Sequence, residues 1–232
     1  MSQFNSIQMA LADLLMALGA VQVKVEGFTL KKHEAHPDAP RSPYFLNLRD
    51  KSNPGKKGTL TPGAYELIAL CWGQVVDNNI LFAVGACGLP HAATPMMKVL
   101  VRQRPQQLVL LDKREEDGRR WIAGVTDRGD LQLGAKVLIF DDVITGADSK
   151  LEAIKVLREA QMRVENVVVV VDRQQGGAEA LAEHGIGTHS VFTVTELMEY
   201  YAATGQVDPS VPQLVRDYIK ADAEFEAGLL SA

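Results

Sequence analysis

Residues 137–150, with the sequence VLIFDDVITGADSK, constrain the fold of this chain more than any other stretch. Four consecutive apolar residues lead into two adjacent carboxylates, Asp141 and Asp142, and a small polar turn then precedes a helical pattern. An uninterrupted apolar run between turn signals favours a strand covered on both faces, as in a parallel sheet. Because functional loops of open α/β sheets lie at the carboxyl ends of such strands, we expect the two aspartates at the mouth of a site. The helix N-terminus that follows suits an anion.

A purely structural interpretation of this segment remains open. Asp141 and Asp142 would then only end the strand, and Asp148 or Ser149 would cap the helix. The segment alone does not separate the two interpretations.

The rest of the chain alternates strands and helices. Strands are expected at 21–30, 80–84, 108–111, 137–140, 167–171 and 188–192. Helices are expected at 5–18, 62–77, from His91 onward, and at 151–160, 178–184, 193–203 and after Pro209. This order predicts an α/β fold, a doubly wound and mainly parallel sheet flanked by helices.

Composition excludes several classes of protein. With 232 residues, 47% of them hydrophobic, the chain can bury one core with a smaller appended element. A net charge of −5 gives no general attraction to nucleic acid or to anionic membranes, so local basic groups must hold any anionic ligand. The sequence shows neither a signal-peptide layout nor a membrane-spanning run. Since Cys71 and Cys87 make no disulfide framework, we expect a cytoplasmic protein.

Three polar or glycine-rich stretches lie between these elements. Residues 31–43 form an exposed loop in which His33 and His36 lack further metal ligands, which favours a solvated loop over a metal site. Residues 85–90, GACGLP, either let a ligand approach the backbone or form a tight turn. Residues 112–130 are a long charged connection, and such a connection is usually functional or disordered.

Together these stretches resemble orotate phosphoribosyltransferase, a type I phosphoribosyltransferase, from about residue 10 to residue 203. The Asp-Asp motif is specific for that superfamily, and FTLK, SPYF and DRQ point to its orotate branch. Residues 18–33 and 41–48 look like the family's hood, 82–92 like its pyrophosphate loop, and 168–177 like its orotate-side strand end. The resemblance implies a helix and hood at 1–60, a phosphoribosyltransferase core at 61–203 and a helical tail at 204–232.

The resemblance also implies an activity. A phosphoribosyl group would pass from phosphoribosyl pyrophosphate to orotate or a related base, in pyrimidine nucleotide biosynthesis, with Mg²⁺ bound through the pyrophosphate. A homodimer is implied as well, in which the loop of Lys113 and Arg114 closes over a site, typically that of the neighbouring subunit.

Residue by residue, the resemblance implies three groups. Those binding phosphoribosyl pyrophosphate are Lys31, Gly85, Ala86, Cys87, Gly88, Asp141, Asp142, Thr145, Gly146, Ala147, Asp148 and Ser149. Those binding the base are Tyr44, Phe45, Thr145 and Arg173, and those with a catalytic role are Lys113, Arg114 and Asp142.

Two departures from the family pattern fall on the chemistry. Asp148 takes the place of the family's threonine. Either it caps the helix amides itself and opposes a 5′-phosphate, or it turns outward and Ser149 takes over. Residues 111–121 lack the family's histidine, and Arg114 stands near its usual lysine. The alternatives are therefore an impaired paralogue that binds a nucleotide-type ligand, in a binding or regulatory role, and a structural paralogue.

Overall fold

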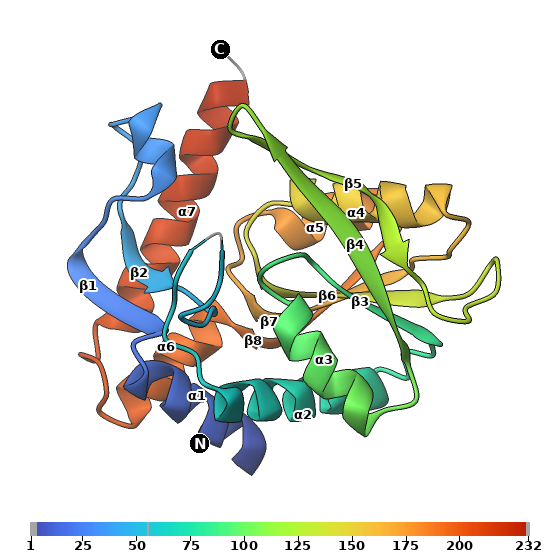
Figure 1. Ribbon diagram of the computed structural model, residues 1–232. Coiled ribbons are helices and arrows are strands. Elements are labelled where there is room, and N and C mark those ends of the chain that lie inside the picture. The colour runs from blue at the N-terminus through green and yellow to red at the C-terminus, as the bar shows by residue number, and fades with distance from the viewer. Residues whose placement is uncertain (1–3, 55, 231–232) are drawn as a thin grey trace.

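The computed structural model describes residues 4–54 and 56–230 (Figure 1). Its centre is a six-stranded sheet in the order β5-β4-β3-β6-β7-β8, and only the edge strand β5 runs antiparallel to its neighbour. The strands are β3 (Gly85–Gly88), β4 (Gln107–Glu116), β5 (Arg119–Asp127), β6 (Val137–Ile144), β7 (Asn166–Asp172) and β8 (Gly187–Thr193). The predicted doubly wound α/β fold is confirmed.

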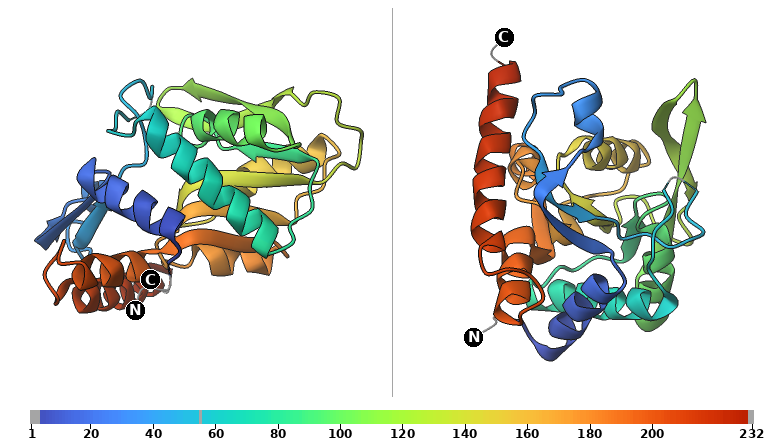
Figure 2. Two further views of the ribbon diagram at one scale, coloured as in Figure 1. Left: turned by 90° about the horizontal axis from the view of Figure 1, so that it is seen from below. Right: turned by 90° about the vertical axis from the view of Figure 1, so that its left-hand side faces the viewer.

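Helices cover the sheet on both sides (Figures 1 and 2). One hydrophobic cluster is built with α1 (Ser6–Ala17), α2 (Pro62–Asn78), α3 (Thr94–Gln103), α6 (Val194–Ala203) and α7 (Val211–Leu230). The other is built with α4 (Asp148–Glu159) and α5 (Gly177–Glu183). Strand β6 contributes residues to both clusters: Leu138 and Phe140 belong to the first, and Val137 and Ile139 belong to the second. This explains why its apolar run is uninterrupted.

No helix in the described ranges is long and apolar enough to cross a membrane.

The hood is a two-stranded antiparallel sheet of β1 (Val21–Phe28) and β2 (Ser42–Leu46), and α7 packs against β2. A short 3₁₀ helix, η1 (Lys31–Glu34), lies between the two strands. His33 is buried there: its Nδ1 accepts from the Leu30 N–H at 2.9 Å, and its Nε2 lies 3.1 Å from the Ala39 carbonyl oxygen. His33 is therefore a structural residue of the hood rather than part of a solvated loop.

The strand predicted at residues 80–84 is wrong. Ile80, Phe82 and Val84 are exposed, and the strand is β3, which follows them. Ile80 has a φ of 54° and the Leu81 N–H donates to the Val76 carbonyl oxygen at 3.0 Å, so these residues end α2 instead of pairing in the sheet. In β3, a Cβ built on Gly88 would meet Met97 Cγ at 2.6 Å and the backbone of Ala93 at 2.9 Å. Glycine thus lets α3 approach the sheet closely, a role distinct from contact with a ligand.

Gly88→Ala should consequently destabilise the protein by about 2–3 kcal/mol, because the added methyl group overpacks the contact between α3 and β3. Urea unfolding followed by circular dichroism would measure the loss. Gly124→Ala in β5 is the matched control, since a Cβ there meets nothing within 4 Å. Equal effects of the two substitutions would contradict this account of Gly88.

The charged residues 112–130 contain a β-hairpin rather than a loop. Strand β4 extends to Glu116, and β5 returns antiparallel to it, with Glu115 opposite Arg120 and Lys113 opposite Ile122. Asp117 and Gly118 join the strands with φ values of 50° and 77°, which matches the two-residue turn that an Asp-Gly pair favours. The hairpin projects from the sheet edge over the face where α4 lies (Figure 1).

Candidate active site

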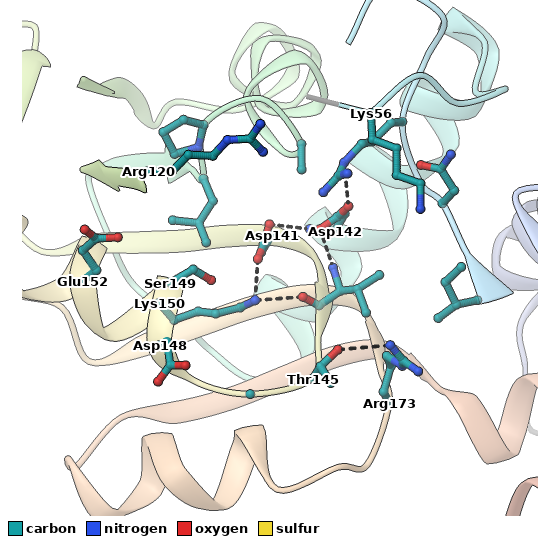
Figure 3. A pocket seen from close by; sticks show the side chains of 18 of the residues that line it. Lys56, Arg120, Asp141, Asp142, Thr145, Asp148, Ser149, Lys150, Glu152 and Arg173 are labelled. Carbon is teal, nitrogen blue, oxygen red and sulfur yellow. Dashed lines mark hydrogen bonds and ion pairs between the residues drawn. The ribbon is translucent and has the colours of Figure 1, made fainter. Parts of the chain in front are cut away.

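A pocket of about 640 Å³ opens at the carboxyl ends of β6 and β7, with the hood on one side and the β4–β5 hairpin on another (Figure 3). Charged side chains dominate its lining. Among the described residues, the basic ones are Arg49, Lys56, Lys113, Arg120, Lys150 and Arg173, and the acidic ones are Asp141, Asp142, Asp148 and Glu152. This local excess of positive charge, in a chain with a net charge of −5, suits a polyanionic ligand.

Asp141 is held on both of its carboxylate oxygens. Its Oδ1 accepts from the Asp142 N–H at 2.9 Å, and its Oδ2 lies 2.5 Å from Lys150 Nζ (Figure 3). Lys150 also donates to the Val143 carbonyl oxygen at 2.8 Å, and the Lys150 and Asp141 side chains are only 5% and 7% exposed. The first aspartate of the motif is therefore one partner of a buried ion pair.

Asp142 has a different environment. Its Oδ1 accepts from the Val143 N–H at 2.8 Å, while its Oδ2 lies 3.9 Å from Arg49 Nε. Burial raises the pKa of Asp142, the adjacent Asp141 raises it further, and Arg49 opposes the rise. Among the described residues, the buried Arg49 Nε has no hydrogen-bond partner. Asp142 and Arg49 thus retain polar atoms for a ligand.

The loop between β6 and α4 brings Thr145, Gly146, Asp148 and Ser149 to the pocket, whereas Ala147 is buried and is the N-cap of α4. The expected capping of this helix by Asp148 is wrong. Asp148 is exposed, no side chain caps the helix, and the carboxylate points away from Asp141 (Figure 3). The helix N-terminus is thereby left open to an anion.

At the end of β7, Arg173 joins the hood to this loop. Its Nε donates to the Tyr44 hydroxyl at 3.2 Å, one terminal nitrogen donates to Thr145 Oγ1 at 3.4 Å, and its guanidinium lies 5.0 Å from the centroid of the Tyr44 ring. Burial raises the pKa of Tyr44, which keeps it a neutral phenol. Phe45 lines the pocket beside Lys56, whose Nζ lies 4.1 Å from the Phe45 ring centroid.

The hairpin supplies Lys113 and Arg120 to the pocket of its own chain. Burial lowers the pKa of Lys113, and the positive charges of Arg120 and Arg49 lower it further. Glu152 of α4 accepts from the Ile122 N–H at 2.9 Å and so ties the hairpin to that helix. Arg114 lies on the other side of β4, 2.8 Å from Asp112, and does not line the pocket.

Other predicted residues also lie elsewhere. The predicted pyrophosphate-loop residues are buried within the sheet: Gly85, Ala86, Cys87 and Gly88. The pocket is lined instead by residues that follow them in the chain, such as Leu89 and Pro90. Lys31 is exposed on η1, outside the pocket lining. The neighbouring Lys32 instead turns toward α7 and pairs with the buried Asp222.

Sequence reasoning missed five charged residues of the pocket: Arg49, Lys56, Arg120, Lys150 and Glu152. Lys150 carried a usable signal, because it lies four and seven residues before Ile154 and Leu157 on the buried face of α4. A lysine at such a position requires a buried partner.

The doubly wound sheet with an acidic pair in β6, a basic pocket above it and a two-stranded hood agrees with the type I phosphoribosyltransferase fold. No family model matches the chain. The chain is 30% identical over 188 residues to the orotate phosphoribosyltransferase of Methanopyrus kandleri, covering 81% of this chain and 90% of that relative. It is also 30% identical over 202 residues to that of Thermosynechococcus vestitus, covering 84% and 98%. The chain belongs to the orotate phosphoribosyltransferase family.

Longer relatives and solved structures agree with this assignment. The chain is 26% identical to uridine 5′-monophosphate synthase of Bos taurus over 185 residues, which cover 78% of this chain and 36% of that longer protein. The UMP synthase of Leishmania donovani superposes with a TM-score of 0.71 at 24% identity, covering 94% of this chain and 42% of that one. Orotate phosphoribosyltransferase from Aeropyrum pernix gives a TM-score of 0.62 at 23% identity, covering 83% and 99%. At these identities the structures establish the shared fold.

Proposed function

We propose that the pocket transfers the phosphoribosyl group of phosphoribosyl pyrophosphate to a ring nitrogen of orotate and releases pyrophosphate. One observation carries the proposal. A guanidinium suited to a carboxylate, that of Arg173, lies in the same pocket as Asp142 and the open N-terminus of α4. A base, a ribose and a phosphate can therefore bind side by side.

The chemistry has an oxocarbenium-like transition state and a polyanionic leaving group, so the protein must position the substrates and neutralise charge. Asp142 accepts hydrogen bonds from the ribose hydroxyls. The loop of Thr145 and Ser149 holds the 5′-phosphate at the N-terminus of α4. Lys113 and Arg120 face the departing pyrophosphate. The Tyr44 hydroxyl and Thr145 orient Arg173 toward the base.

Magnesium is proposed to enter with the pyrophosphate. The acidic pair itself does not fit a divalent cation, because Lys150 already occupies Asp141 and Arg49 faces Asp142. Among the described residues, no group of three or more His, Cys, Asp or Glu side chains suits a metal ion. We also propose that the protein is a cytoplasmic homodimer. Sedimentation would measure the mass of the dimer.

The proposed function is tested by incubating the protein with orotate and magnesium phosphoribosyl pyrophosphate. Chromatography would detect the orotidine 5′-monophosphate that forms. Lys113→Ala should lower kcat/KM about 10²-fold, because it removes a cation that faces the leaving group. Arg114→Ala is the matched control: the next residue of the same strand points away from the pocket and should change the rate less than about twofold. Absence of product with the unmodified protein would overturn the proposal, and equal losses in the two variants would refute the placement of Lys113.

A further inference from the structure

Neither Lys150 nor Asp141 contacts a substrate in the roles proposed above. Lys150 projects from the first turn of α4 to the end of β6, where its Nζ lies between Asp141 Oδ2 at 2.5 Å and the Val143 carbonyl oxygen at 2.8 Å (Figure 3). A carboxylate and a backbone carbonyl are the oxygen donors that hard cations take in proteins. The ammonium group therefore occupies the position that a bound cation would take on Asp141.

The second carboxylate has a cation of its own, since Asp142 Oδ2 lies 3.9 Å from Arg49 Nε. The two adjacent carboxylates, which lie within β6, repel each other and any polyanion that enters the pocket. A cation supplied by the chain weakens both repulsions. Buried Lys150 is such a cation, and its ion pair with Asp141 keeps it in place.

We propose that Lys150 is a positioning residue that acts as the resident cation of the acidic pair. It fixes the carboxylate of Asp141 through Oδ2, while the Asp142 N–H fixes Oδ1. It also excludes a divalent metal ion from the pair, so that magnesium enters this pocket only on the pyrophosphate of the substrate. Asp142 is left as the carboxylate of the pair that meets the ribose.

The test uses Mn²⁺ alone, without substrate, and measures its binding by electron paramagnetic resonance and calorimetry. Lys150→Met should bind Mn²⁺ at least tenfold more tightly than the unmodified protein, because it uncovers Asp141 Oδ2 and the Val143 carbonyl oxygen beside the second carboxylate. Lys155→Met is the matched control: it removes the same charge from the same helix at a side chain that is 76% exposed. It should bind Mn²⁺ as the unmodified protein does.

A double variant, Asp141→Asn with Lys150→Met, should lose the gained Mn²⁺ site, which would locate that site at Asp141. Lys150→Gln provides a second route should Lys150→Met fail to fold, because its neutral amide can still donate to Asp141. Circular dichroism would establish folding before each titration. The proposal is overturned when the unmodified protein binds Mn²⁺ as tightly as a folded Lys150 variant.

A kinetic measurement tests the positioning role and rests on the proposed function. Lys150→Met should raise the KM for magnesium phosphoribosyl pyrophosphate about tenfold and change kcat less. The substitution removes a positive charge from the pocket, so the negative charge of the acidic pair repels the polyanionic substrate more strongly. An unchanged KM would overturn the positioning role. The Mn²⁺ titration requires no turnover, so failure of the proposed function and failure of this inference give different results.

Discussion

Asp142→Asn is expected to lower kcat/KM about 10²-fold while making the protein more stable at neutral pH. The loss of activity follows from the proposed contact between the carboxylate and the ribose hydroxyls, because a hydrogen bond to a charged group contributes about 1.5–3 kcal/mol. The gain in stability follows from the environment of Asp142, where burial and the adjacent Asp141 both disfavour the ionised form.

The pH dependence of this gain follows from the raised pKa of Asp142 in the folded state. In the unfolded chain the carboxyl group has a pKa of about 3.9, so the native state binds more protons above that pH. The free energy of unfolding of the unmodified protein therefore falls as the pH rises from about 4 to the raised pKa. The Asp142→Asn substitution would remove this cost. The advantage of the variant should be absent below about pH 4 and reach about 1–3 kcal/mol above the raised pKa.

Urea unfolding and thermal melting across this pH range would measure the difference, with Tm rising by about 3 °C for each 1 kcal/mol. Asp141→Asn is the matched control, because it lies one residue away and should have the opposite effect. That substitution leaves Lys150 buried without its partner and should destabilise the protein by about 3 kcal/mol. A loss of stability in Asp142→Asn would contradict the environment assigned to this residue.

The sequence was informative where local chemistry decides the structure. Asn5 and Thr61 cap α1 and α2, and such caps can be read from a sequence because a cap depends on residues only two or three positions away. The apolar run of β6 predicted a strand buried on both faces, and both hydrophobic clusters contain its residues.

Long-range contacts set the features that the sequence did not predict. The bounds of β3 are set by its pairing with β4 and β6, two strands that lie far from it in the sequence. The hairpin was hidden because its strands are charged, although Asp117 and Gly118 are a turn signal. The sequence pattern indicates that Lys150 needs a buried partner. It does not identify Asp141 as that partner, because only the fold brings the two residues together.

Arg173→Ala should raise the KM for orotate roughly 10²-fold and leave the KM for phosphoribosyl pyrophosphate nearly unchanged. A guanidinium can donate two parallel hydrogen bonds to the orotate carboxylate, and loss of such a charged contact costs about 2–4 kcal/mol. Arg173 is held for this role by the Tyr44 hydroxyl at 3.2 Å and by Thr145 Oγ1 at 3.4 Å. Arg173→Lys should give an intermediate KM, because it keeps the charge without the planar fork.

Two comparisons make this prediction specific. The ratio of kcat/KM for orotate to that for uracil, which lacks the carboxylate, should fall in Arg173→Ala, because the lost contact recognises that group alone. Tyr44→Phe keeps the ring beside Arg173 and removes the hydroxyl that orients it, so it should raise the KM for orotate only about threefold to tenfold. A rise in the KM for phosphoribosyl pyrophosphate instead, with the orotate-to-uracil ratio unchanged, would place a phosphate group rather than the base carboxylate at Arg173.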